Sequence, residues 1–140
     1  MTTQLIRDTG FVAEDWPHGF TANPREISGD HGAGLDLAPG ADLTEIAPRL
    51  PSLGMIRIRF TGFADGRGFT LARQLRLMGY SGRLRAHGSL IADQYAMARR
   101  AGFDEVEVPA ALALRQAEPH WRFRADWQAH DHQAALRAAI

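Results

Sequence analysis

Residues 55–108, MIRIRFTGFADGRGFTLARQLRLMGYSGRLRAHGSLIADQYAMARRAGFDEVEV, decide the fold, because short β-like runs alternate there with helix-like runs. The runs at 55–60, 83–87 and 104–108 are short, rich in apolar or branched residues and bounded by glycines, which predicts three strands. The two runs between them have apolar residues at helical spacing and end at Gly79 and Gly102. Strand, helix, strand, helix, strand in this order predicts right-handed parallel crossovers.

These three strands alternate apolar and charged residues. Successive side chains of a strand point to opposite faces, so Arg57 and Arg59 share one face and Ile56 and Ile58 the other. A parallel strand covered by helices on both sides would instead be apolar throughout. The sequence therefore predicts a sheet with one apolar face and one charged face, on which opposite charges stabilise neighbouring strands by about 0.2–1 kcal/mol a pair. The other charged-face residues are Arg83, Arg85, His87, Glu105 and Glu107.

Similar units flank this stretch. Residues 35–37 predict a strand, and the run at 43–50 predicts a helix that Asp42 caps and Pro51 ends. A further helix is predicted at 110–118, after the last strand. About four successive βα units with a mainly parallel sheet form half of an eight-stranded barrel or a small flavodoxin-like sheet, and the charged face favours the half-barrel.

The chain length suits a single α/β domain of residues 1–140. We expect an N-terminal hairpin or irregular arm at 1–30, the βα repeats at 31–119 and a tail at 120–140. Thr9 and Gly10 are suited to the hairpin turn, and Trp16 is expected to anchor the arm to the body, with a subunit contact as the alternative.

The tail contains two tryptophans and several histidines. Trp121, Phe123 and Trp127 are suited to cover the sheet or a partner subunit, and the apolar end of the tail predicts a homodimer contact. His130 and His132 resemble metal ligands, but side chains two apart on a helix point to different sides. We therefore predict no metal site.

Composition excludes several chemistries. All sixteen basic residues are arginine and they balance sixteen acidic residues, which argues against a general nucleic-acid or membrane binder. The absence of lysine excludes Schiff-base chemistry, and the absence of cysteine excludes thiol nucleophiles, disulfides and thiolate-bound metals. No apolar run is long enough to span a membrane and no signal peptide opens the chain, so the expected compartment is the cytoplasm.

The loop that follows residues 55–60 is the first candidate site. Ligands of parallel α/β folds bind where strands end and helices begin. Gly66 and Gly68 let the backbone approach a ligand, Arg67 offers a fork of donors and Asp65 can handle a proton. The alternative is a tight turn closed by an internal bridge between Asp65 and Arg67.

The next strand ends in a second group of candidates. Arg85 can hold an anion, and His87 is an acid–base candidate, although an unreactive histidine is the alternative. Asp93 and Gln94 open the following helix and are further ligand-binding candidates, but Asp93 is also explained by the helix dipole.

The segments FADGRGFTLARQLR, GYSGRLRAHGSLIADQ and RRAGFDEVEV, with the Trp127–Gln128 pair and Trp16, carry a family resemblance. The chain resembles a bacterial family of unknown function that is linked to sulfite reduction as an oxidoreductase, because its genes lie beside those of sulfate assimilation. This resemblance implies a role in sulfur metabolism. It also implies that the partner is sulfite reductase or another sulfur-assimilation protein. It supplies no catalytic residues.

Three hypotheses remain open. The first is an accessory protein of assimilatory sulfite reduction, in which the arginine-rich sheet face and the loop at 65–68 bind a small oxyanion. The second is an enzyme for a small anionic substrate, with Asp65 and His87 as acid and base and Arg67 and Arg85 as clamps. The third is a structural dimeric module. No cofactor is predicted, since the chain has no GxGxxG fingerprint.

Overall fold

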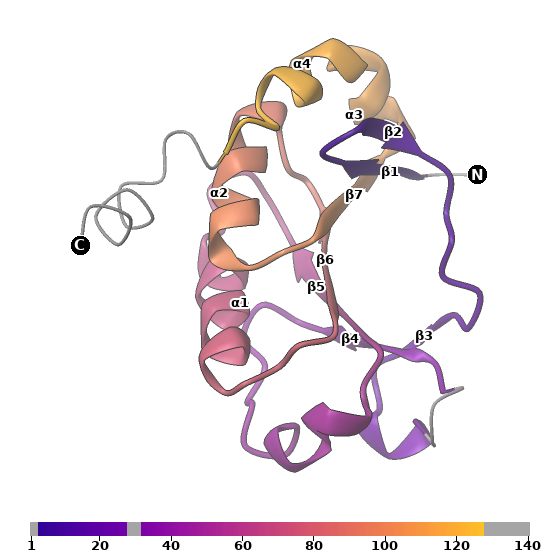
Figure 1. Ribbon diagram of the computed structural model, residues 1–140, viewed down its shortest axis with the longest axis vertical. Coiled ribbons are helices and arrows are strands. Elements are labelled where there is room, and N and C mark those ends of the chain that lie inside the picture. The colour runs from indigo at the N-terminus through magenta and orange to yellow at the C-terminus, as the bar shows by residue number, and fades with distance from the viewer. Residues whose placement is uncertain (1–2, 28–31, 128–140) are drawn as a thin grey trace.

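The computed structural model describes residues 3–27 and 32–127 and is a mixed α/β fold (Figure 1). Within these residues seven strands form one open sheet in the order β2-β1-β7-β6-β5-β4-β3. From β3 to β7 the strands are parallel and neighbours in chain order, whereas β1 pairs antiparallel with both β2 and β7. The bounds are β1 Thr3–Arg7, β2 Gly10–Val12, β3 Phe20–Thr21, β4 Gly34–Leu37, β5 Met55–Phe60, β6 Arg83–Gly88 and β7 Glu105–Pro109.

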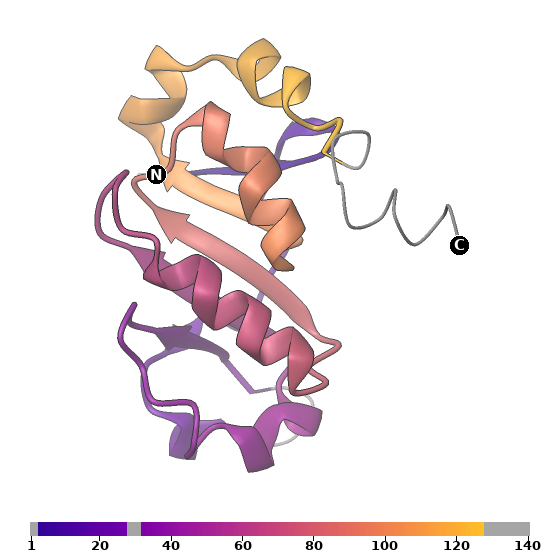
Figure 2. The same ribbon diagram turned by 90° about the vertical axis from the view of Figure 1, so that its left-hand side faces the viewer.

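Helices α1 and α2 lie side by side over one face of the sheet, in front of the strands in Figure 2. They connect β5 to β6 and β6 to β7, as the predicted crossovers require. The helices are α1 Arg67–Leu77, α2 Tyr95–Ala101, α3 Ala110–Arg115 and α4 Glu118–Phe123, with 3-10 turns η1 Pro24–Glu26, η3 Ala47–Ser52 and η4 Ala92–Gln94. The prediction of an α/β fold with an N-terminal hairpin is confirmed.

The hydrophobic core lies between these helices and the predicted apolar face. Ile56, Ile58 and Phe60 of β5 are buried there. The Phe60 ring packs 4.9 Å from that of Phe69 and 5.8 Å from that of Phe103, measured between centroids. Each fully buried side chain of this size contributes about 1.5–3 kcal/mol to folding, so this single layer anchors the sheet.

Two predicted helices differ from the structure. The run at 43–50 forms turns and then the 3-10 helix η3, because Pro48 and Pro51 have no N–H to donate within an α-helix. Asp42 accepts a hydrogen bond from the N–H of Thr44 at 2.9 Å, so it closes a turn rather than capping an α-helix. The helix predicted at 110–118 ends at Arg115, and α4 begins separately at Glu118.

The N-terminal arm crosses the face of the sheet opposite α1 and α2. The hairpin turn lies at 8–9, one position before the predicted Thr9–Gly10, because Gly10 already belongs to β2. Residues 13–19 then run from β2 to β3, down the right side of Figure 1. Trp16 donates from Nε1 to the carbonyl of Gly19 at 2.8 Å, and a Cβ on Gly54 would lie 3.2 Å from its ring. This position, against the start of β5, agrees with the predicted anchoring role of Trp16.

No helix in residues 3–27 and 32–127 combines the length and the apolar content that a membrane span requires.

Candidate functional site

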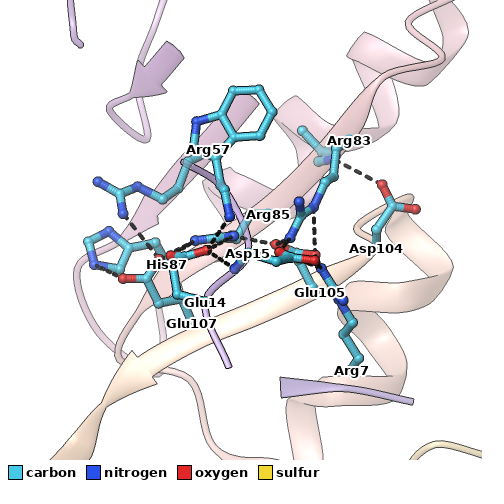
Figure 3. Close-up of polar contacts among 12 residues, drawn as sticks. Arg7, Glu14, Asp15, Arg57, Arg83, Arg85, His87, Asp104, Glu105 and Glu107 are labelled. Carbon is cyan, nitrogen blue, oxygen red and sulfur yellow. Dashed lines mark hydrogen bonds and ion pairs between the residues drawn. The ribbon is translucent and has the colours of Figure 1, made fainter. Parts of the chain in front are cut away.

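Arg85 of β6 is the centre of the charged face (Figure 3). Its side chain is fully buried, and Nε donates to Glu105 at 2.5 Å while Nη1 donates to Glu107 at 2.9 Å. Both glutamates come from β7, whose register sets Glu105 opposite Arg85. The arm adds a third carboxylate, since Nη1 and Nη2 of Arg85 donate to the two oxygens of Glu14 at 2.6 and 2.7 Å. Every guanidinium nitrogen of Arg85 therefore already donates to a carboxylate.

Two further arginines extend this arrangement toward the amino end of β6. Arg83 donates from Nε to Glu105 at 2.9 Å and also binds Asp15 of the arm. Arg7 of β1 binds the same two carboxylates, Asp15 at 2.8 Å and Glu105 at 3.1 Å. The arm is thus held to the sheet by two consecutive acidic residues.

Arg57 extends the arrangement in the other direction. It donates to Asp36 of β4 at 2.6 and 2.9 Å and to Glu107 at 3.1 Å. The ring of Phe20 covers Arg57, with 3.7 Å between the guanidinium carbon and the ring centroid. We call the whole set the charge network, and its members are Arg7, Glu14, Asp15, Asp36, Arg57, Arg83, Arg85, Glu105 and Glu107. Four arginines face five carboxylates, so the charge network has no spare positive charge.

Within the network, the contacts favour the ionised forms of Arg85, Glu14 and Glu107. Burial by itself would lower the pKa of Arg85, but its bonds to Glu14 and the two β7 glutamates outweigh burial and raise the pKa. The hydrogen bonds from Arg85 lower the pKa of Glu14. Burial would raise the pKa of Glu107, but the bond from Arg85 and the charges around it lower that pKa. The predicted pairing of arginines with glutamates across the strands is therefore present as ion pairs of Arg83 and Arg85 with Glu105, and of Arg85 with Glu107.

The attachment of the arm is expected to weaken in acid. The hydrogen bond from Arg7 is the largest influence on Asp15 and, together with the bond from Arg83, outweighs burial and lowers the pKa of Asp15 from 3.8 to about 2. A carboxyl whose folded pKa is depressed stabilises the fold above its unfolded pKa and loses that contribution as pH falls through the folded pKa. The melting temperature of the native chain should exceed that of Asp15→Asn at neutral pH, and the gap should close between pH 3.8 and about 2. A gap that stays constant over that range would contradict the assigned contacts.

A hollow of about 420 Å³ lies beside the charge network, at the carboxyl ends of β4, β5 and β6. Arg59 and His87, which are direct neighbours in the register of β5 and β6, contribute its polar wall with Asp36. Among the described residues, Arg59 has no hydrogen-bond or ion-pair partner, and it is exposed. The remaining lining residues are Ala22, Leu37 and Ala38.

His87 connects the hollow to the network. Its Nε2 lies 3.7 Å from a Glu107 carboxylate oxygen, which is longer than a hydrogen bond. Burial, and next the charge of Arg57, lower the pKa of His87, while Glu107 and Asp36 oppose this shift. At neutral pH the ring is therefore uncharged, with one nitrogen that donates and one that accepts.

The loop of the first candidate site forms a closed turn. Asp65 accepts from Arg67 Nε at 2.9 Å and from the Thr61 hydroxyl at 2.8 Å. These bonds lower the pKa of Asp65, the bond from Arg67 first. The Arg67 side chain is nevertheless 62 % exposed, whereas the Asp65 side chain is 11 % exposed. This geometry is the internal bridge considered as the alternative, and a ligand role for the loop stays a prediction.

The two glycines of this loop have different surroundings, which makes a testable pair. A Cβ at Gly68 would lie 2.5 Å from the buried Phe60 ring, whereas a Cβ at Gly66 would have no atom within 4 Å. Overpacking of this kind costs about 1–3 kcal/mol, so Gly68→Ala should lower the free energy of unfolding by that amount. Gly66→Ala should change it by less than about 0.5 kcal/mol. Urea denaturation of both variants checks this, and equal losses would contradict the packing described.

The other candidates lie apart from the hollow. Gln94 donates from Nε2 to the carbonyl of Phe63 at 2.8 Å and accepts from the N–H of Ile91 at 3.0 Å, so it braces the 61–66 loop. Asp93 accepts from Arg124, beyond α4, at 2.8 Å. The structure thus brings His87 next to the charge network around Arg85, and Gln94 next to the loop of Asp65–Gly68, but the two groups share no contact among the described residues.

Sequence reasoning placed Arg59 on the charged face but did not select it as a site residue. The available signal was its position as the second-last residue of a predicted strand, on the charged face and at the carboxyl edge. The acidic partners Glu14 and Asp15 carried no local signal, because the arm has no regular spacing.

The tail residues are only partly within the described chain. Trp121 is buried and donates from Nε1 to the carbonyl of Gln116 at 2.8 Å, so it covers the molecule's own core. Trp127 lies at the other end of this segment, with the Arg99 guanidinium carbon 4.7 Å from its ring centroid. His130, Asp131, His132 and Gln128 lie outside the described residues. Within residues 3–27 and 32–127, no three His, Asp or Glu side chains are arranged to hold a metal ion.

Comparison with other proteins identifies the family of the chain. No curated protein and no solved structure matches it. A family model described as "Bacterial protein of unknown function (DUF934)" matches residues 34–136, which include β4 to β7 and all four helices. This match confirms the resemblance to a bacterial family of unknown function, and it carries no information on sulfite reduction. Because the model spans most of the 140 residues, the chain belongs to the DUF934 family.

Proposed function

We propose that this protein is an accessory protein that binds a small oxyanion in the hollow beside Arg59 and His87. The observation that carries the proposal is the unneutralised guanidinium of Arg59 at the carboxyl edge of a parallel sheet. Ligands of open α/β sheets bind at this edge, where the strands end. We further propose that the protein acts in assimilatory sulfite reduction in the cytoplasm, which the family resemblance supports by gene association alone.

The charge network explains why the binding site is Arg59 rather than Arg85. An oxyanion at Arg85 would have to displace Glu14, Glu105 or Glu107 from a buried guanidinium. An oxyanion at Arg59 replaces water only, because Arg59 has no partner among the described residues. A charge-assisted hydrogen bond contributes about 1.5–3 kcal/mol to affinity.

The same contacts favour binding over the acid–base alternative. Asp65 and Arg67 bond to each other, and Arg85 is saturated, so neither arginine is free to clamp a substrate. His87 remains available in the hollow as a hydrogen-bond donor. A second candidate, a structural dimeric module, is favoured by the neutralised charge network, and the predicted homodimer belongs to it.

The test is an isothermal titration with sulfite, sulfate and phosphate at fixed ionic strength. The native chain should bind at least one of them, and Arg59→Gln should weaken that binding by about 10- to 100-fold, which corresponds to the loss of one charge-assisted bond. Arg73→Gln is the matched control, since Arg73 is an exposed arginine on α1. Arg67→Ala examines the 65–68 loop in the same way.

No binding of any small oxyanion, inorganic or organic, would overturn this proposal and favour the structural module. The next measurement would then be a pull-down with sulfite reductase, which tests the predicted partner, alongside sedimentation to test the predicted homodimer. Loss of binding in Arg67→Ala but not in Arg59→Gln would move the site to the loop.

A further inference from the structure

The charges around the hollow suit a ligand with one negative charge. Arg59 supplies one guanidinium without a partner among the described residues. The other arginine nearby, Arg57, already gives two hydrogen bonds to Asp36 at 2.6 and 2.9 Å. The Asp36 side chain is 36 % exposed, lines the hollow and belongs to the charge network, in which carboxylates outnumber arginines, so a second negative charge on a ligand would be disfavoured there. Among the described residues, Arg59 is therefore the cation available to a ligand, and Asp36 limits the negative charge that a ligand in the hollow can carry.

His87 adds a directional group without adding charge. Its side chain lines the hollow. The charged groups that face it are the cations Arg57, Arg59 and Arg85 and the carboxylates of Glu107, on the neighbouring strand β7, and Asp36, on β4 beyond β5. A neutral imidazole donates one hydrogen bond to an anionic oxygen but offers it no net charge. Among the described residues, a doubly charged ion would thus have Arg59 as its one unpaired cation to compensate two charges.

The size and the wall of the hollow point to a ligand larger than an inorganic ion. Its volume is about 420 Å³, whereas one water molecule occupies about 30 Å³ of the liquid. Three of its lining residues, Ala22, Leu37 and Ala38, are nonpolar. Small-molecule sites commonly combine a nonpolar wall with a few polar groups that orient the ligand. A bare tetrahedral oxyanion on Arg59 would leave this wall in contact with water.

We infer that the hollow binds a singly charged oxyanion that carries a small nonpolar group, a short-chain sulfonate or carboxylate, in preference to a doubly charged inorganic oxyanion. The inference rests on the proposed function, because it assigns the class of ligand for the same site. In the bound state the anionic oxygens accept from Arg59 and His87, and the nonpolar group covers Ala22 and Ala38. A sulfonate shares its three-oxygen sulfur group with sulfite.

The experiment is a set of isothermal titrations of the full chain with 1-propanesulfonate, butyrate, sulfate and sulfite, at neutral pH and equal ionic strength. 1-Propanesulfonate or butyrate should bind at least about tenfold more tightly than sulfate, because only the organic ions match both the single charge and the nonpolar wall. Arg59→Gln should weaken the organic anions at least about tenfold, and Arg73→Gln should not.

A second variant separates the nonpolar wall from the charge. Ala38 is exposed, so Ala38→Leu can fill part of the hollow without disturbing the core. It should weaken 1-propanesulfonate and leave sulfate unchanged, with circular dichroism confirming that each variant is folded. Sulfate that binds as tightly as 1-propanesulfonate, or Ala38→Leu without effect on 1-propanesulfonate, would overturn this inference and leave oxyanion binding at Arg59 in place. Failure of all four anions to bind would overturn the proposed function and this inference together.

Discussion

Replacing Arg85 by methionine is expected to lower the free energy of unfolding by about 3–5 kcal/mol, the cost of breaking a buried ion pair from one side. Methionine keeps much of the side-chain volume but donates no hydrogen bond. Glu105 and Glu107, which are almost fully buried, would each lose their bond to Arg85 and remain charged. Urea denaturation measures the loss through the midpoint, at constant slope.

Two controls make the Arg85 result specific. Arg73→Met changes an exposed arginine and should alter stability by less than about 0.5 kcal/mol. The conservative variant Arg85→Lys keeps a positive charge beside Glu14, Glu105 and Glu107 but loses the fork of donors, so it should lose less stability than Arg85→Met. A loss below about 1 kcal/mol in Arg85→Met would contradict the central role of Arg85 and show that Arg7, Arg57 and Arg83 compensate the two glutamates without it.

The second large effect is expected at Trp121. Its side chain is buried, with the ring centroid 6.3 Å from that of Tyr95 in an edge-on arrangement. Its Nε1 also donates to the backbone carbonyl of Gln116. The side-chain oxygen of Gln116 in turn accepts from the N–H of Ala92 at 2.6 Å. Trp121 therefore joins α4 to η4 and α2. Trp121→Ala should cost about 3–5 kcal/mol, as measured by urea or thermal denaturation.

Phe123 provides the matched comparison on the same helix. Its side chain is 76 % exposed, so Phe123→Ala should change the free energy of unfolding by less than about 0.5 kcal/mol. If the tail forms the predicted homodimer contact, Phe123→Ala should weaken self-association in sedimentation while leaving the monomer folded. Equal destabilisation by the two substitutions would contradict the burial assigned to α4.

The local pattern of the sequence was sufficient to predict the strands of the sheet and its two faces. Alternation in residues 55–60 separated Ile56 and Ile58 from Arg57 and Arg59, and the structure places them on opposite faces as predicted. Strand and helix periods are local properties, so each segment carries its own evidence. The errors occurred where the local signal is ambiguous: prolines at 48 and 51 turned a helical apolar pattern into a 3-10 helix.

Whether each arginine is ion-paired could be read only from the tertiary structure. Glu14 binds Arg85 across 71 positions, and Asp15 binds Arg83 across 68 positions, and no local spacing predicts such contacts. Because the arm brings two carboxylates onto the sheet, Arg83 and Arg85 are neutralised. Arg59 lies two residues after Arg57 on the same face of β5, and it has no partner among the described residues.

By itself, the sequence determined the parallel βα order, the two-faced sheet and the kinds of chemistry that an all-arginine, cysteine-free chain excludes. These properties follow from residue type and short-range periodicity, which are independent of distant contacts. Which cation of the charged face lacks a partner among the described residues depends on the tertiary fold, because the pairing of a charge is set by the distant segments that contact it. The candidate site therefore moved from the arginines that stand out in the sequence to Arg59, which the fold leaves unneutralised within the described chain.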